Sequence, residues 1–334
     1  MNINPKVMFI CFQTIFFIIF IVIIISTLSN NKKNHKNVIT ASELQIKYKD
    51  IINKIYNMII NDEELNKNRI EHNKNLKTGI TLILAGFLLS FILGLGIPLI
   101  IAGVIYLIKL SKNSYSDSYK EKIVQFALKE YDDNLEYYPT GCIPEEQYEI
   151  ADFENYDRFY SEDRINGTIL GHNFIMADVH VEDRREDSDG DTTYVTLFNG
   201  PVAIVQLPKS IDFELSIEND SIKLFNRKKI VEIDNPDFEE IYDVYTNDKV
   251  KAMVVLTPAV TNRMLDLYNK YGFVFEFKFV KNYMYFRFHS GSLFVPNANS
   301  PMDEAVGVAR YFEIIDGIKD IMKGVIESTE SVRR

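Results

Sequence analysis

The apolar run from Gly79 to Ile108 constrains this chain more than any other feature of its sequence. It contains no charged residue over 30 positions. A helix on the surface of a soluble domain keeps a polar face, and a core helix is seldom apolar over such a length. The run therefore predicts a segment that lies in a lipid bilayer.

Two interpretations of this run are open, because about 20 residues suffice to cross the hydrocarbon at ~1.5 Å each. One is a single tilted helix kinked at Pro98, which lacks an N–H and crowds the carbonyl of Gly94. The other is a tight hairpin, in which Gly94 and Gly96 end a first helix and Pro98 begins a second. We assign residues 78–110 to a transmembrane helix or a tight helical hairpin.

A second apolar segment, from Val7 to Leu28, precedes this run. Its apolar core is longer than that of a signal peptide and no small-residue cleavage site follows it. We therefore expect an uncleaved transmembrane anchor over residues 7–28.

An amphipathic helical loop is expected between the two apolar segments, over residues 29–77. Thr40 and Glu43 have the spacing of a capping box. Apolar residues recur at helical spacing behind them, at Leu44, Tyr48, Ile51, Ile52, Ile55, Ile59 and Ile60. This helix either packs on its neighbours or the membrane face, or forms a dimerising coiled coil.

Charge is unevenly distributed along the chain. Residues 1–122 hold 15 Lys and Arg against 8 Asp and Glu, whereas the remainder holds 22 against 39. The acidic part repels phosphate, so we expect no nucleic-acid partner. The basic margin beside the apolar segments is what an anionic leaflet attracts. Because a hairpin would gather almost all of these cations on one side, we expect a multi-pass protein of the cell membrane with a cytoplasmic C-terminal domain.

The C-terminal part predicts an α+β domain over residues 134–327, with a mainly antiparallel sheet packed with helices on one side. A stalk helix over residues 114–133 precedes it. The strand candidates are residues 163–170, 173–182, 192–198, 202–207, 212–217, 221–225, 273–280 and 283–289.

The last two strand candidates form a hairpin around the two-residue turn Lys281-Asn282. The phenylalanines of the first strand alternate with Glu276 and Lys278, which predicts one buried aromatic face and one polar face. Helices are expected from Thr257-Pro258 to about Tyr271 and from about Met302 to Glu327, the second with an apolar stripe of helical period.

No residue pattern predicts a catalytic, cofactor or metal site. The histidines lack the pairing with Glu, Asp or Cys at helical spacing that builds a zinc site; they are His35, His72, His172, His180 and His289. The acids Asp187, Asp189 and Asp191 alternate like the start of a calcium loop. However, Thr192 and Phe198 occupy the positions that need Gly and Glu. We interpret Asp189-Gly190 as the tip of a hairpin.

Two further segments carry nucleophilic side chains without the pattern of a catalytic site. Cys142 lies in a turn and has no base beside it in the sequence. Ser290-Gly291-Ser292 lacks the flanking glycines of a nucleophile elbow. The other cysteine, Cys11, lies in the first apolar segment, so we expect no disulfide, as in a reducing compartment.

A set of short segments recurs in a known order and spacing: Tyr137-Tyr138-Pro139, Tyr160–Gly167, Leu197-Phe198-Asn199-Gly200, Phe238, Tyr242–Asp248, Leu256-Thr257-Pro258 and Glu313-Ile314-Ile315-Asp316. In these segments the chain resembles a bacterial domain of unknown function, the family numbered 3137, over about residues 118–325. Members of that family typically carry apolar segments before the domain, which favours the hairpin. The family has no established activity, so the resemblance implies no catalytic residue.

These observations favour a membrane-anchored protein whose acidic domain is an interaction or sensing module at the inner membrane face. One alternative is a membrane-associated enzyme whose site is not visible as a sequence motif. Another is an oligomeric membrane scaffold built on the Ile-rich helix of residues 44–60. The expected partners are the lipid bilayer and an unidentified protein, and a homo-oligomer stays open.

Overall fold

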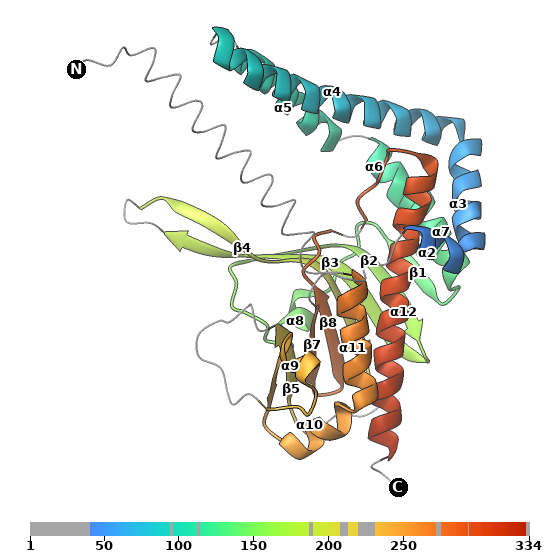
Figure 1. Ribbon diagram of the computed structural model, residues 1–334, viewed down its shortest axis with the longest axis vertical. Coiled ribbons are helices and arrows are strands. Elements are labelled where there is room, and N and C mark those ends of the chain that lie inside the picture. The colour runs from blue at the N-terminus through green and yellow to red at the C-terminus, as the bar shows by residue number, and fades with distance from the viewer. Residues whose placement is uncertain are drawn as a thin grey trace. The chain divides into compact units, whose positions relative to one another are not determined.

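The computed structural model describes residues 41–93, 96–111, 114–186, 190–207, 213–219, 231–271, 275–292 and 294–331 (Figure 1). The chain divides into two compact units. Within the described residues, the first unit comprises 56–119 and 296–304, and the second comprises 41–55, 120–295 and 305–331. The anchor predicted over residues 7–28 lies outside the described residues.

The first unit consists largely of helices. α4 (Glu63–Leu93) and α5 (Ile97–Ser111) pack against each other as an antiparallel pair, and α6 (Ser114–Ser118) contacts α4 (Figure 1). Among the helices that the structure describes, none has both the length and the apolar character needed to cross a membrane.

The apolar run is thus divided between two helices and is not one kinked helix. Pro98 lies in the first turn of α5, where its missing N–H leaves no hydrogen bond unmade. The carbonyl oxygen of Gly96 starts that turn by accepting the N–H groups of Leu99 and Ile100, both at 3.1 Å.

The helical segments on either side of this pair follow the sequence pattern with local breaks. Residues 41–61 form α2 (Ala41–Lys47) and α3 (Lys49–Asn61) instead of one helix. Residues 114–131 form α6, a single π-helical segment η1 (Tyr119–Val124) and α7 (Gln125–Tyr131).

The second unit is built on an eight-stranded antiparallel sheet, which confirms the predicted α+β class. The strand order is β1-β2-β3-β4-β8-β7-β5-β6. Their bounds are β1 (Leu135–Tyr138), β2 (Arg158–Ile169), β3 (His172–Glu186), β4 (Thr192–Gln206), β5 (Leu215–Asn219), β6 (Tyr242–Thr246), β7 (Phe275–Val280) and β8 (Tyr283–Phe288).

Several strands differ from the sequence prediction in their bounds or in their number. The two strands expected over residues 192–198 and 202–207 are the single strand β4, which ends at Gln206. Pro201 does not interrupt it, because β4 pairs with β8 only from Val202 onward and Pro201 has a partner only on β3. The short strands β1 and β6 were not predicted, and the candidate 221–225 lies outside the described residues.

The β7–β8 hairpin has the predicted register. Val280 pairs with Tyr283 across the turn Lys281-Asn282. Lys281 has a φ of +56°, the left-handed conformation that a tight hairpin turn requires.

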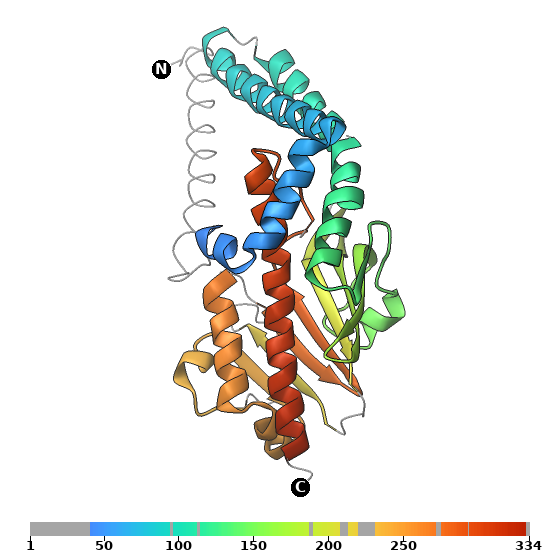
Figure 2. The ribbon, with the colours of Figure 1, turned by 90° about the vertical axis from the view of Figure 1, so that its right-hand side faces the viewer.

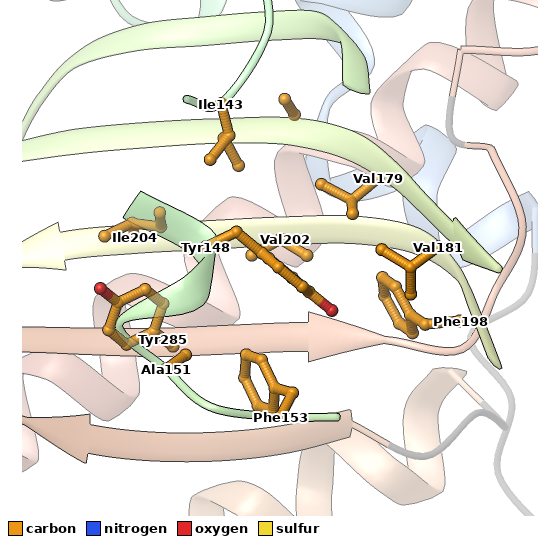
Figure 3. Packing of buried hydrophobic residues seen from close by; sticks show 11 residues of the cluster. Ile143, Tyr148, Ala151, Phe153, Val179, Val181, Phe198, Val202, Ile204 and Tyr285 are labelled. Carbon is orange, nitrogen blue, oxygen red and sulfur yellow. The ribbon is translucent and has the colours of Figure 1, made fainter. Parts of the chain in front are cut away.

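Both faces of the sheet are covered, which corrects the prediction of helices on one side. Figure 2 shows α11 (Pro258–Tyr271) and α12 (Pro301–Ser331) side by side over one face. The opposite face is covered by α8 (Glu145–Glu149) and the segment after it, whose Tyr148 and Phe153 pack on strand residues including Val202 (Figure 3). The alternation of Glu276 and Lys278 with phenylalanines predicted a polar face of the β7–β8 hairpin. The chain between β1 and β2 folds back over that face and covers it.

Capping side chains mark the points where helices of this unit begin. α9 (Pro236–Glu239) and α10 (Lys249–Val255) are capped by Asn235 and by Asp248, whose side chain accepts the Lys251 N–H at 3.1 Å. α11 starts at Thr257-Pro258 as expected. The predicted apolar stripe of α12 is buried along its length, at Tyr311, Ile314, Ile315, Ile318, Ile321, Met322 and Val325.

Candidate functional site

The α4–α5 pair forms a hairpin with an apolar outer surface. Large apolar side chains are exposed along both helices, and Leu88 and Ile97 near the turn are each exposed by more than half, at 61% and 62%. From Gly79 onward, the others among the described residues are Ile80, Leu84, Ile101, Val104, Ile105, Tyr106 and Ile108. An apolar surface of this extent is typical of a protein, membrane or ligand contact.

Glycines allow the two helices of the hairpin to approach closely. A Cβ on Gly86 would lie 2.8 Å from the carbonyl oxygen of Gly96, and a Cβ on Gly103 would lie 2.7 Å from that of Gly79. Both contacts are closer than side chains tolerate. Small residues at a helix contact are the usual means of tight packing where lipid, and not water, surrounds the helices.

A groove of about 640 Å³ lies in the second unit, beside the turn that follows β1. Cys142, His180 and Ser292 all line this groove, although they are far apart in the sequence. Cys142 is an exposed free thiol. However, the His180 Nε2 lies 3.2 Å from Thr196 Oγ1, and no hydrogen bond of the described residues joins it to Cys142.

A network of charged side chains is buried under α8. The Arg287 guanidinium donates to carboxylate oxygens of both Glu276 and Glu154. It also lies over the ring of Phe153, 4.0 Å from the ring centroid. The Tyr148 hydroxyl lies 3.2 Å from Arg287 Nη1 and donates to Glu154 at 2.5 Å.

Glu276 stays ionised in this network although it is only 2% exposed. Burial opposes its charge, but Arg287 and His289 outweigh burial and lower the pKa of Glu276 to about 2. Arg287 pairs with both Glu276 and Glu154, so neither carboxylate is left without a cation and the cluster offers no free group for chemistry.

The first unit holds a buried carboxyl group that, unlike Glu276, has no cation paired with it in the part of the chain that the structure describes. Glu304, in the first turn of α12, is 1% exposed, and neither of its carboxylate oxygens has a hydrogen-bond partner among the described residues. The Tyr115 hydroxyl and the His72 Nδ1 atom are likewise buried without a partner in the described chain. The rings of His72 and Tyr115 lie 5.4 Å apart.

Burial raises the pKa of Glu304 to about 7, and the nearby Tyr115 hydroxyl and Arg69 only partly oppose this rise. Arg69 does not neutralise Glu304, because its guanidinium donates to Asn66 Oδ1 at 3.0 Å and to the Ala298 carbonyl oxygen at 3.0 Å. Burial also lowers the pKa of His72. The cluster is therefore able to bind or release a proton near neutral pH.

No sequence pattern singles out Glu304, Glu276 or Arg287 as a candidate functional residue. Glu276 and Arg287 alternate with aromatic residues, a pattern that also describes an exposed strand face. Glu304 resembles any acidic residue in the first turn of a helix. Their burial depends on segments distant in the sequence.

The candidate calcium loop falls in the sequence between the end of β3 and the start of β4. Asp187 and Asp189 lie outside the described residues, and Asp191 directly precedes β4. No group of three or more His, Cys, Asp or Glu in the described part of the chain could hold a metal ion.

The second unit defines an α+β domain on an eight-stranded antiparallel sheet, and the first unit contains an apolar helical hairpin. Residues 196–325 match the sequence model of the family described as "Protein of unknown function (DUF3137)". The resemblance to that family is therefore confirmed over this segment. The match begins later in the chain than the predicted start near residue 118.

Comparisons with other proteins add little beyond the family. A search of the curated proteins finds no match. The crystal structure of the mycobacterial trehalose monomycolate transport factor A, TtfA, is similar at 9% sequence identity. The similarity covers 59% of this chain and 93% of that one, with a TM-score of 0.31.

Proposed function

We propose that this protein is anchored in a membrane through the α4–α5 hairpin, and that its acidic α+β domain is an interaction or sensing module at the inner membrane face. The proposal rests on the hairpin itself, which exposes apolar side chains along both helices and contains no charged residue from Gly79 to Ile108. Water solvates such a surface poorly, whereas lipid tails solvate it well.

The length of the hairpin favours entry and return on one side of the bilayer. α5 contains 15 residues, and the apolar part of α4 from Gly79 is similar in length. Each arm therefore extends ~22 Å, which is shorter than the ~30 Å of hydrocarbon. In this arrangement both ends of the hairpin emerge at the same face, together with their flanking lysines.

A second candidate function, a membrane-associated enzyme, is supported by one observation. The groove beside β1 places the Cys142 thiol near His180 and Ser292. A chemical step there requires a base to engage Cys142, which the hydrogen bonds of His180 do not provide. We therefore favour the interaction module.

Membrane insertion of the hairpin is testable by site-directed spin labelling of the full chain in lipid vesicles. In a Cys11→Ser, Cys142→Ser background, single cysteines replace Leu88, Ile101 or Val250 and carry a nitroxide. Val250, which is 76% exposed in the α+β domain, is the matched control. We expect labels at 88 and 101 to be accessible to oxygen and shielded from a water-soluble nickel chelate, with the reverse at 250.

Accessibility of positions 88 and 101 to the nickel chelate would contradict the proposal. Reporter fusions after Asn37 and after Asn113 test the sidedness, and both are expected to report the cytoplasm. A translocated reporter at either position would overturn the inner-face assignment.

A further inference from the structure

α4 changes from polar to apolar within one turn, and a groove lies at that transition. The groove has a volume of about 510 Å³. Ile70, Lys74 and Lys77 line it from the polar half of the helix, and Thr81 and Leu82 line it from the apolar half. One surface thus combines two cations with apolar side chains at the point where the charged residues end.

The two lysines are the cationic groups that this groove offers. They are three residues apart, so they lie on one face of the helix, and both are exposed. Neither has an ion-pair partner among the described residues, in contrast to Lys47 and Lys54 of the second unit. The Thr81 hydroxyl donates to the Lys77 carbonyl oxygen at 2.7 Å, so its proton is already used.

The packing of the hairpin determines where these lysines lie, along the axis of α4, relative to its apolar part. A Cβ on Gly79, two residues after Lys77, would lie 2.8 Å from the Leu107 side chain. The start of the apolar part of α4 therefore lies beside the end of the apolar part of α5. When the hairpin is inserted, Lys74 and Lys77 are level with the lipid phosphates, which lie just outside the hydrocarbon.

We propose that the groove at Lys74 and Lys77 binds the phosphate group of anionic phospholipids in the leaflet that the hairpin enters. This inference rests on the proposed membrane insertion. The ammonium groups pair with the phosphate, while Leu82, which lies on the bilayer side of the two lysines, contacts the upper acyl chain. The two lysines match the phosphate group of such a lipid, and the adjoining apolar surface matches its acyl chains.

The test measures lipid selectivity of the full chain reconstituted in phosphatidylcholine vesicles. Trace spin-labelled phosphatidylglycerol and spin-labelled phosphatidylcholine report the relative association constants of the two lipids by electron paramagnetic resonance. We expect a preference for phosphatidylglycerol that falls by up to about fivefold for each of Lys74→Gln and Lys77→Gln, and that is reduced in high salt. Lys67→Gln is the matched control, an exposed lysine of the same helix outside the groove, and should leave the preference unchanged.

The outcomes separate this inference from the proposed function. If the chain inserts but the Lys74→Gln/Lys77→Gln variant retains the full preference, the lipid site is wrong and the anchor stands. If the chain does not remain with the vesicles, the proposed function itself fails. If inorganic phosphate removes the preference at an ionic strength where chloride does not, the groove takes free phosphate and the lipid assignment is overturned.

Discussion

Two buried glutamates of this protein show that a neighbouring cation decides whether a buried carboxyl group is charged. Glu276 in the sheet is 2% exposed and Glu304 at the start of α12 is 1% exposed. The pKa of Glu276 is lowered to about 2, whereas that of Glu304 is raised to about 7. Nearly equal burial thus accompanies opposite shifts.

The difference lies in what the neighbouring arginine does with its donors. Arg287 directs its guanidinium at Glu276 and Glu154. Arg69 directs its donors at Asn66 and at the Ala298 carbonyl oxygen, so Glu304 receives no hydrogen bond from it. A buried acid with a matched cation stabilises the fold at neutral pH, and one without a matched cation becomes a proton-binding group.

The largest effect is expected from removing the cation of the matched cluster. Arg287→Met leaves Glu276 and Glu154 buried without a counter-charge, which should cost about 3–5 kcal/mol of unfolding free energy. Urea unfolding of the full chain in mild detergent, followed by circular dichroism, measures this loss. The control is Arg184→Met, which breaks an exposed pair with Glu186 and should cost less than about 1 kcal/mol. Equal losses of unfolding free energy in the two variants would show that Arg287 contributes no more than an arginine of an exposed ion pair.

The second effect is a pH dependence that comes from Glu304. Its pKa rises from an ordinary value of 4.5 to about 7 on folding, so the folded protein binds the proton more tightly than the unfolded chain. The contribution of this group to the unfolding free energy is fully present below about pH 4.5. It falls as the pH rises to about 7 and is constant above that, and the total fall is about 3 kcal/mol. Unfolding measurements between pH 5 and pH 8 should show this decline.

Glu304→Gln isolates that contribution. The variant should be close to the native protein near pH 5 and more stable than it at pH 8. The charged groups that act on Glu304 are Arg69 on α4 and Asp303 on α12, and the Tyr115 hydroxyl on α6 lies near it; all are retained in the variant. An identical pH dependence in both proteins would exclude Glu304 as its source.

The smallest effect is expected from the Tyr115 hydroxyl group, which opposes the rise in the pKa of Glu304. Tyr115→Phe keeps the ring and removes a dipole that favours the ionised carboxylate, so the pKa of Glu304 should rise further, by less than about one unit. Carbon-13 chemical shifts of the labelled Glu304 carboxyl group, followed against pH, measure this change. A lowered pKa in the variant would contradict the assigned role of the hydroxyl.

Features with a local cause were predictable from the sequence. Thr257-Pro258 starts α11 and Lys281-Asn282 closes the β7–β8 hairpin, because caps and turns depend on neighbouring residues alone. The break before Pro98 was one of the two interpretations that the sequence allowed, since glycine and proline act on the backbone directly.

Features that depend on distant segments were not predictable. Gly200 and Pro201 look like a turn, yet β4 continues through them because β3 pairs alongside. Glu276 and Lys278 look like an exposed face, yet the segment near Phe153 covers them, and the Lys278 ammonium donates to the Asp152 carbonyl oxygen at 2.6 Å.

By itself, the sequence determined the apolar character of residues 79–108, the α+β class and the acidic balance of the C-terminal domain. These properties follow from composition and from periodicities of a few residues. The tertiary structure alone decided which charged groups are buried and which of them are matched. The free energy of a buried charge depends on the few groups around it in space, and those groups come from segments that are remote along the chain.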